Sequence, residues 1–215
     1  MIWLNSDISF PDVSLADEDG LLAAGGDLSP QRLLLAYRNG IFPWYNEDEP
    51  VLWWSPHPRC VLFPEKLRIS KSMQQVIRSH QFRFKINHSF REVITSCKTI
   101  QRKEGNGTWI HQDIIDAYTN LFEMGYAMSA ETYFQGKLAG GLYGVKIGKV
   151  FFGESMFTEV TNASKFALIQ LVLHLKKEGL QVIDCQMQTS HLMSLGAEMI
   201  DRDFFVELLN KHCNE

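Results

Sequence analysis

The sequence predicts a mixed α/β fold of the α+β class. Segments with helical periodicity alternate with strand-like segments along most of the chain, and three consecutive strand-like segments occupy 126–134, 137–146 and 149–157. The dipeptide Ile147-Gly148 between the last two predicts a hairpin turn, so these neighbours should be antiparallel. Helices combined with antiparallel hairpins are typical of this class.

The first 60 residues predict a small N-terminal domain, and residues 61–215 a second, larger one. The first part is rich in turn-forming dipeptides, and the proline pair Pro56 and Pro58 marks the expected boundary. The part before that boundary contains one clear helix.

This helix has a start and a stop signal. Ser29 is placed to cap it, Pro30 occupies its first position, Leu33 to Tyr37 form an apolar stripe, and Gly40 ends it.

The remaining elements follow from the same signals. A long helix is expected from Asn162, its N-cap, through Lys176 and Lys177 in the last turn, with Gly179 as its C-cap. A short strand over 180–185 follows it. Further helices are predicted at 70–79, 89–102, 111–124 and 201–212.

Composition is that of an ordinary globular protein, with 45% hydrophobic and 21% charged residues in 215. No apolar run approaches the roughly 20 residues of a membrane helix. The N-terminus lacks a basic region and contains Asp7, which does not fit a signal peptide. We therefore expect a cytoplasmic protein with no membrane partner.

The cysteines do not indicate a metal site. The four of them, Cys60, Cys97, Cys185 and Cys213, are far apart and form no CxxC pair, and His57 near Cys60 is only half of a zinc site. We expect buried free thiols and no metal.

Charge is distributed unevenly. The net charge of −4 is the sum of −7 over residues 1–58, +9 over 59–103 and −6 over 104–215. The basic block predicts contact with a polyanion, and the alternative is a solvated helical face. Its bases are Arg59, Lys66, Arg68, Lys71, Arg78, Arg83, Lys85, Arg91, Lys98, Arg102 and Lys103.

Three polar residues stand out beside strands. Glu154 follows an aromatic strand segment, and Asp184 and Gln186 end an apolar one. Residues two apart in a strand point to the same side, so we expect Asp184 and Gln186 to face one site together. The alternative for a lone strand-end aspartate is a turn or helix cap. The nucleotide-binding loops GxGxxG and GxxxxGK[ST] are absent from the sequence.

Tryptophans lie in Gly- or Pro-rich surroundings rather than on periodic core faces. Stacking on unpaired bases of RNA would suit these residues and their neighbour, namely Trp44, Tyr45, Trp53, Trp54 and Trp109, and the alternative is that they pack between subdomains.

Motifs along most of the chain resemble the leucyl/phenylalanyl-tRNA–protein transferase family. The matching stretches are GLLAAGGDLSPQRLLLAYRNGIFPWY (20–45), LWWSPHPRCVLFPEKLRISKSM (52–73), GTWI (107–110), AGGLYGV (139–145), GESMF (153–157), NASKFAL (162–168), DCQ (184–186) and HLMSLGAEMIDRDFF (191–205). One departure is Met128, which stands where members usually have a histidine.

The resemblance implies a GNAT-like acyltransferase domain after the small N-terminal one. It implies an enzyme that takes Leu, Phe and less readily Met from aminoacyl-tRNA, uses no coenzyme A or other cofactor, and attaches the amino acid to proteins that begin with Arg or Lys, creating an N-degron. Carried over by motif, Asp184, Gln186 and Glu154 become the catalytic residues, and one of Trp53 and Trp54, together with Trp109, lies near the terminal adenosine.

Two further sets of residues complete the expected site. The apolar pocket for the carried amino acid is expected to include Met156, Phe157, Phe166, Ile169 and Gln170. The tRNA backbone is expected to contact Lys66, Arg68, Lys71, Arg78, Arg83 and Lys85.

Two other functions compete with this one. An acetyl-CoA-dependent GNAT enzyme needs a Gly-rich loop before a helix, and the link from Phe157 to Asn162 contains no glycine. A non-catalytic RNA-binding module would explain the bases and aromatics but leave DCQ and GESMF without a role. We expect a monomer.

Overall fold

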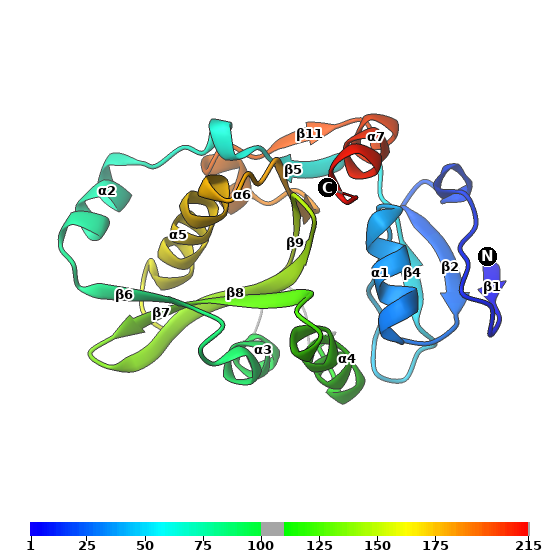
Figure 1. Ribbon diagram of the computed structural model, residues 1–215, viewed down its shortest axis with the longest axis horizontal. Helices are drawn as coiled ribbons and strands as arrows, with labels where there is room; N and C mark the ends of the chain where they lie inside the picture. Colours follow the sequence, from blue (N-terminus) through cyan, green and yellow to red (C-terminus); the bar gives the residue numbers. More distant parts are fainter. Residues whose placement is uncertain (100–109, 215) are drawn as a thin grey trace.

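The protein is built around two β-sheets, as the computed structural model shows (Figure 1). The structure describes residues 1–99 and 110–214. One sheet has four strands in the order β1-β2-β4-β3, and the other has seven in the order β11-β5-β10-β9-β8-β7-β6. Helices pack beside both, which confirms the mixed α/β class.

The four-stranded sheet belongs to the N-terminal part of the chain, drawn in blue in Figure 1. Its strand β4 is paired with β2 on one side and β3 on the other, both antiparallel, and β1 is parallel to β2. Its strands are β1 (Ile2–Leu4), β2 (Leu21–Gly25), β3 (Phe42–Pro43) and β4 (Leu52–Trp54), with the 3-10 turn η1 (Val13–Leu15) and helix α1 (Pro30–Arg38) between them.

The first strand along the chain that belongs to the seven-stranded sheet is β5. The chain therefore passes from one sheet to the other between Trp54 and Arg59. Adjacent strands are antiparallel except β9 and β10, which are parallel. The domain boundary at residue 60 stays a prediction. The strands are β5 (Arg59–Leu62), β6 (Phe82–Ile86), β7 (Ala127–Phe134), β8 (Lys137–Ile147), β9 (Val150–Thr158), β10 (Val182–Gln186) and β11 (Glu198–Ile200).

Helices cover both faces of this sheet. Helix α5 packs along β7 and β8 on one face, while α3 and α4 lie on the other (Figure 1). Helix α1 contacts α4, so the N-terminal part joins the core on the α3–α4 face. The helices after α1 are α2 (Lys71–Arg78), α3 (Phe90–Thr99), α4 (Gln112–Glu123), α5 (Ala163–Lys177), α6 (Ser190–Ser194) and α7 (Arg202–His212), and η2 (Pro64–Lys66) is a 3-10 turn.

The expected helices are present in the described residues. The Ser29 side chain accepts a hydrogen bond from the Arg32 amide, as an N-cap should, and Gly40 follows α1 with a φ of 74°. Only the last part of the helix expected at 89–102 lies outside the described residues, beyond Thr99.

One local expectation was wrong, and a second, Asn162 as the N-cap of α5, holds for its position but not for a side-chain capping bond. Register pairs Ile147 directly with Val150, so the hairpin turn is Gly148-Lys149 rather than Ile147-Gly148. Asn162 precedes α5 in a left-handed conformation, with a φ of 73°, and its side chain makes no capping hydrogen bond. Asparagine suits this position because Asn and Asp adopt the left-handed backbone conformation more readily than most other L-residues.

Strands β9 and β10 separate at the centre of the sheet. Their pairing runs from Val150/Val182 to Phe152/Asp184 and then stops, although both strands continue. Each strand also contains an extra residue there: the register against β8 skips Glu154, and the register against β5 skips Cys185. The unpaired ends of the two strands therefore open the sheet at a defined place.

Candidate active site

A cavity of about 650 Å³ lies where β9 and β10 separate. It is lined by Glu154, Ser155 and Gln186, by apolar side chains of the sheet and of α5 and α6, and by the Phe42–Trp44 segment of the N-terminal part. The apolar residues of the sheet and α5 that line it are Leu142, Phe151, Met156, Leu168 and Ile183. The cavity is thus an apolar space with a few polar groups, which is typical of small-molecule sites.

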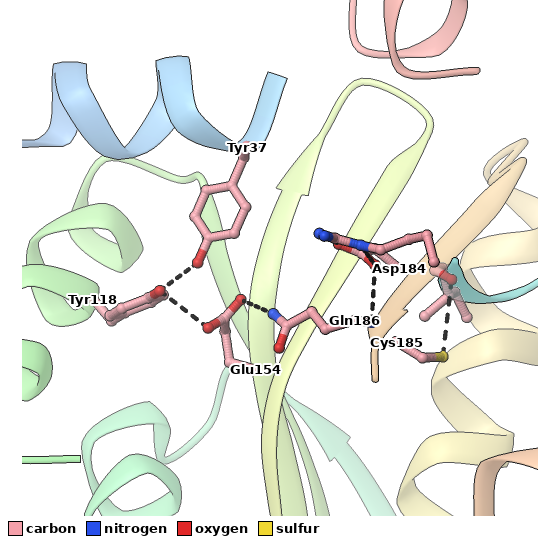
Figure 2. A network of polar contacts seen from close by, with 8 residues as sticks. Tyr37, Tyr118, Glu154, Asp184, Cys185 and Gln186 are labelled. Carbon is pink, nitrogen blue, oxygen red and sulfur yellow. Dashed lines mark hydrogen bonds and ion pairs between the residues drawn. The ribbon is translucent and has the colours of Figure 1, made fainter. Parts of the chain in front are cut away.

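Glu154 stands at the centre of a chain of hydrogen bonds that Figure 2 shows. Its Oε2 accepts from the Tyr118 hydroxyl at 3.0 Å, and its Oε1 accepts from Gln186 Nε2 at 3.0 Å. The Tyr118 hydroxyl in turn is hydrogen-bonded to that of Tyr37. The carboxyl group is therefore held from three elements, α1, α4 and β10.

Burial raises the pKa of Glu154 to about 7, although the hydroxyls of Tyr37 and Tyr118 oppose the shift. The negative charge of Asp184 raises this pKa further, and Arg59 lowers it. Burial also raises the pKa of both tyrosines well above its ordinary value, so they stay protonated and act as donors. Glu154 thus changes charge near neutral pH.

Gln186 occupies an unusual backbone position. Its φ is 61°, and its amide nitrogen donates to Asp184 Oδ1 at 2.9 Å. This positive φ lies next to the bulge at Cys185, where the register between β10 and β5 shifts by one residue. A backbone held in this region by the surrounding structure is a common feature of functional sites.

Asp184 is completely buried and paired with Arg59, which is about equally buried. Arg59 Nε is 2.8 Å from Asp184 Oδ1, and Arg59 Nη2 is 2.7 Å from Oδ2. The guanidinium also lies between the rings of Phe42 and Phe205, 4.8 and 4.9 Å from their centres. This bidentate pair joins β5 to β10 and fixes the strand end that carries Gln186.

Asp184 and Gln186 both line the cavity, but the regular alternation from which we expected this does not hold between them. Asp184 pairs with Val61, but Gln186 pairs with the neighbouring Cys60, because Cys185 is the extra residue. Neighbouring residues of a strand face opposite sides, so this shift cancels the expected alternation. Gln186 reaches Glu154 with its side chain, whereas Asp184 binds Arg59 and the backbone amide of Gln186.

Of the residues expected to form the amino-acid pocket, the structure brings Met156 to the cavity wall. It does not bring the other four there. Phe157 points to the opposite face of β9, and Phe166 packs against Phe82. Ile169 is buried in the core beneath α5, and Gln170, on the same helix, does not line the cavity. Sequence proximity to GESMF was a poor guide because the alternation along β9 and the turn of α5 direct these side chains elsewhere.

The tryptophans also differ in whether they line the cavity. Trp53 is 0% exposed, packs edge-on against Phe10 and donates from Nε1 to the Gly25 carbonyl at 2.9 Å, so it has no ring face free for a base. Trp54 is half-buried and donates to the Trp44 carbonyl at 2.6 Å. Trp44 is 40% exposed and lines the cavity. Trp109 lies outside the described residues.

The six bases expected to contact tRNA are all exposed, five of them on η2, α2 and β6 and Arg68 in the link between η2 and α2. Lys66 pairs with Glu198 at 2.6 Å, and Lys85 lies over the ring of Tyr133. Arg59, also in the basic block, is by contrast buried in the ion pair with Asp184. Met128, which replaces the usual histidine, is buried in β7 and does not line the cavity.

Among the described residues, no group of three or more His, Cys, Asp or Glu side chains is arranged to hold a metal ion. The four cysteines, all within the described ranges, form no disulfide. No helix in that part of the chain is long and apolar enough to cross a membrane.

Sequence reasoning did not identify Tyr37, Tyr118 or Arg59 as part of this site. Tyr37 belongs to the apolar stripe of α1, and Tyr118 occupies a buried position of α4, so both resemble core residues. Their hydroxyls are the distinguishing feature, because a buried tyrosine hydroxyl needs a hydrogen-bond partner.

The raised pKa of Glu154 predicts a change of stability with pH. The folded protein holds this proton more tightly than the unfolded chain, so the stability it contributes is full below the unfolded pKa near 4.5 and is lost as the pH rises through about 7. The variant Glu154→Gln should escape this loss, and its stability relative to the unsubstituted protein should rise by about 2 kcal/mol between pH 5 and pH 8. Urea unfolding at both pH values measures the difference, and a difference that does not change with pH would contradict the prediction.

Two family profiles match the chain. The profile described as "Leucyl/phenylalanyl-tRNA protein transferase" matches residues 61–210, and the profile for the N-terminal domain of the same transferase matches residues 26–57. The match to the N-terminal domain precedes the longer match along the chain.

Curated relatives named leucyl/phenylalanyl-tRNA–protein transferase match almost the full length. The protein from Flavobacterium johnsoniae is 53% identical over 97% of this chain and 99% of its own. The one from Christiangramia forsetii is 53% identical over 97% and 100%, and the one from Nitrosomonas europaea is 52% identical over 97% and 89%.

Similar solved structures are more distant. A GCN5-related N-acetyltransferase-like protein from Streptococcus suis covers 67% of this chain and 57% of its own, with a TM-score of 0.40 and 14% identity. L-PGS from Bacillus licheniformis covers 78% and 53%, with a TM-score of 0.46 and 11% identity. At these TM-scores neither likeness supports a conclusion. The profiles and the full-length relatives are sufficient: the chain belongs to the leucyl/phenylalanyl-tRNA–protein transferase family.

Proposed function

We propose that the protein transfers Leu, Phe and less readily Met from aminoacyl-tRNA to the α-amino group of proteins that begin with Arg or Lys. The observation that carries this proposal is the cavity between β9 and β10, which combines an apolar wall with the Glu154–Gln186 pair. Family membership supplies the reaction class. We place the reaction in the cytoplasm and expect a monomer to perform it.

The reaction needs no external activation. The amino acid is already joined to the tRNA by an ester, and the acceptor's α-amino nitrogen attacks the ester carbonyl. The new C–N bond forms while the C–O bond to the ribose of the terminal adenosine breaks, and the proton lost by the amine ends on the ribose oxygen. Because a free α-amine has a pKa of about 7.7–8.0, a useful share is neutral at cellular pH.

Gln186 orients the attacking amine. Its Nε2 donates to Glu154, so its Oε1 is left to accept an N–H from the acceptor amine. An ionised Glu154 can only accept hydrogen bonds, and it therefore fixes the amide in this orientation; a protonated Glu154 permits the reverse one. The amide is not a conventional base, and its contribution is electrostatic orientation of the amine.

We also assign to Glu154 the binding of the α-ammonium group of the carried amino acid. Both of its oxygens accept hydrogen bonds already, and each retains a lone pair for a further donor. Asp184 acts through Gln186 by holding its backbone amide, so we treat Asp184 as a positioning residue.

The apolar wall accounts for the choice of amino acid. Leu142, Phe151 and Met156 offer a surface that fits Leu or Phe, and Leu168 and Ile183 extend it. One methylene more or less in such a pocket changes binding by about 1–3 kcal/mol, so Met should be a poorer donor. Trp44, which lines the same cavity, is the tryptophan we assign to the adenine, together with Trp109.

We place the tRNA backbone on Lys66, Arg68, Lys71, Arg78, Arg83 and Lys85. Their support is that all six side chains are exposed within the stretch from η2 to β6. Reversing Lys71, Arg78 and Arg83 to Glu should weaken the binding of every tRNA alike and reduce the salt dependence, because phosphate contacts do not read sequence. Titrating the variant with two different tRNAs at several salt concentrations measures this. An unchanged Kd and salt slope, in a protein that melts normally, would favour the solvated-face alternative.

Acceptor choice tests the proposed function. Labelled Leu-tRNA is incubated with peptides that differ only in the first residue, and Arg or Lys should be labelled while Ala is hardly labelled. Equal labelling of all three would overturn the acceptor assignment. A parallel reaction with acetyl-CoA in place of Leu-tRNA should leave every peptide unmodified.

A further inference from the structure

Two of the four cysteines lie together where β5 meets β10. Strand β10 has its extra residue at Cys185, so Cys185 and Gln186 together oppose Cys60 on β5. Cys60 is 0% exposed, and Cys185 is half-buried. Both belong to the apolar cluster that α5 covers, in which Cys185 packs against the buried residues that include Cys60. The two thiols are therefore neighbours on one face of the sheet.

The two thiols also interact with each other. A hydrogen bond with the Cys185 thiol lowers the pKa of Cys60, although burial opposes the shift. The same hydrogen bond, together with burial, raises the pKa of Cys185 well above its ordinary value. The pair therefore loses one proton more readily than an isolated buried thiol does, and it retains the other. A thiolate held beside a thiol is prepared for disulfide formation, because the thiolate is the attacking species.

The backbone spacing suits a disulfide between them. Directly opposed residues of antiparallel strands have Cα atoms roughly 4.5–5.5 Å apart, and disulfides usually join Cα atoms about 4.4–6.8 Å apart. Cys60 and Cys185 are opposed across the bulge. The other two cysteines are not on strands: Cys97 is in α3, and Cys213 follows α7.

The cavity gives a small oxidant access to this pair. Cys185 lines the cavity of about 650 Å³, whereas Cys60 is not among the described residues that line it. Hydrogen peroxide is small enough to enter the cavity and contact the Cys185 sulfur. Cys60 is then the buried thiol that completes the disulfide.

We propose that Cys60 and Cys185 form a reversible disulfide when hydrogen peroxide enters the cavity. The proton shared by the pair moves to Cys60, and the Cys185 thiolate attacks one peroxide oxygen. The O–O bond breaks, Cys185 becomes a sulfenic acid, and the hydroxide that leaves takes the proton of Cys60 to become water. The Cys60 thiolate then attacks the Cys185 sulfur, so that the S–S bond forms and the S–O bond breaks. The second hydroxide takes a proton from solvent, and the peroxide has been reduced while the two sulfurs have been oxidised.

The disulfide slows transfer by displacing Gln186. A disulfide holds its sulfurs about 2.0 Å apart, closer than hydrogen-bonded thiols, so its formation draws Cys185 toward β5. Strand β10 lies between β5 and β9, so this movement carries the adjacent Gln186 away from β9 and from its 3.0 Å hydrogen bond with Glu154. The effect on transfer rests on the proposed function, whereas formation of the disulfide does not.

Peptide mapping by mass spectrometry tests the disulfide itself. The reduced protein is treated with increasing hydrogen peroxide, remaining thiols are alkylated, and the protein is digested without reductant. We expect a cross-linked pair of peptides that contain Cys60 and Cys185, which dithiothreitol separates, while Cys97 and Cys213 are alkylated. The absence of this cross-link at every peroxide concentration that leaves the protein folded would overturn the proposal, even if Cys185 alone is oxidised. A cross-link to Cys97 or Cys213 instead would also overturn it.

Activity measurements separate the disulfide from general oxidative damage. The matched variants are Cys60→Ala and Cys213→Ala, which each replace a buried thiol outside the residues that line the cavity. Burial raises the pKa of Cys213 to about 12, so its thiol is unreactive. Peroxide should lower kcat for transfer from Leu-tRNA about tenfold in the unsubstituted protein and in Cys213→Ala, because a small misplacement of Gln186 slows the reaction. KM for Leu-tRNA should not change, and dithiothreitol should restore kcat.

Cys60→Ala should keep its kcat under the same exposure to peroxide. An equal loss in Cys60→Ala that dithiothreitol reverses would overturn the role of the pair, and a complete cross-link with unchanged kcat would overturn the displacement of Gln186. A reduced, unsubstituted protein that transfers no leucine overturns the proposed function instead, and the peptide map still decides whether the disulfide forms.

Discussion

Replacing Arg59 with methionine is expected to lower the free energy of unfolding by about 3–5 kcal/mol, the cost of leaving a buried charge without its partner. Arg59 and Asp184 are both almost completely inaccessible to water, and each nitrogen–oxygen contact is shorter than 3 Å. Methionine fills much of the space between Phe42 and Phe205, so lost packing contributes little. The cost comes from Asp184, which is left buried and unpaired.

Lys66→Met is the matched control for this prediction. Lys66 and Glu198 form an ion pair of similar length, 2.6 Å, but both side chains are exposed, and its loss should cost less than about 1 kcal/mol. Chemical denaturation of the two variants gives the comparison. The double variant Arg59→Met with Asp184→Leu should recover much of the loss, since it removes the unpaired charge. An Arg59→Met cost no greater than that of Lys66→Met would show that the pair does not hold β5 to β10.

Gln186→Ala is expected to lower kcat about 100-fold and to leave the Kd for aminoacyl-tRNA unchanged. The variant removes the amide whose oxygen accepts the N–H of the attacking amine, an interaction made as the new bond forms. Alanine keeps a Cβ at the same positive φ, so the backbone conformation at the bulge carries the same constraint. Single-turnover transfer and equilibrium tRNA binding measure the two quantities separately.

Asp184→Asn separates positioning from chemistry. The asparagine oxygen can still accept the Gln186 backbone amide, but the ion pair with Arg59 is lost. We expect it to lower thermal stability as well as kcat, whereas Gln186→Ala should lower kcat with little loss of stability. Loss of tRNA binding in proportion to activity in both variants would mean that these residues are structural and that the mechanism is wrong.

Helices were predictable because their signals are local. Ser29, Pro30 and Gly40 mark the ends of α1 within twelve residues of sequence, and the structure uses them as expected. Short strands such as β3, β5 and β11 have no comparable local signal. They exist because partners distant in sequence supply their hydrogen bonds, as β5 does for both β10 and β11.

Three polar residues of the candidate site were predictable from the sequence, but the geometry of the site was not. Glu154, Asp184 and Gln186 carry chemistry that core residues rarely need, so they stood out. Their relative directions depend on two bulges, and a one-residue shift reverses every side chain that follows it. The partners Tyr37 and Tyr118 are brought to Glu154 by tertiary packing of α1 and α4, which no periodicity in the sequence reveals.

The most direct measurement is the product itself. The purified protein is incubated with leucine-charged tRNA and a peptide that begins with arginine, with no added nucleotide triphosphate or coenzyme A, and the peptide is examined by mass spectrometry. The account predicts a peptide that has gained one leucine residue on its N-terminal α-amine, together with an equal amount of uncharged tRNA. An unmodified peptide beside intact Leu-tRNA, or a peptide that is modified only when acetyl-CoA is supplied, would contradict it.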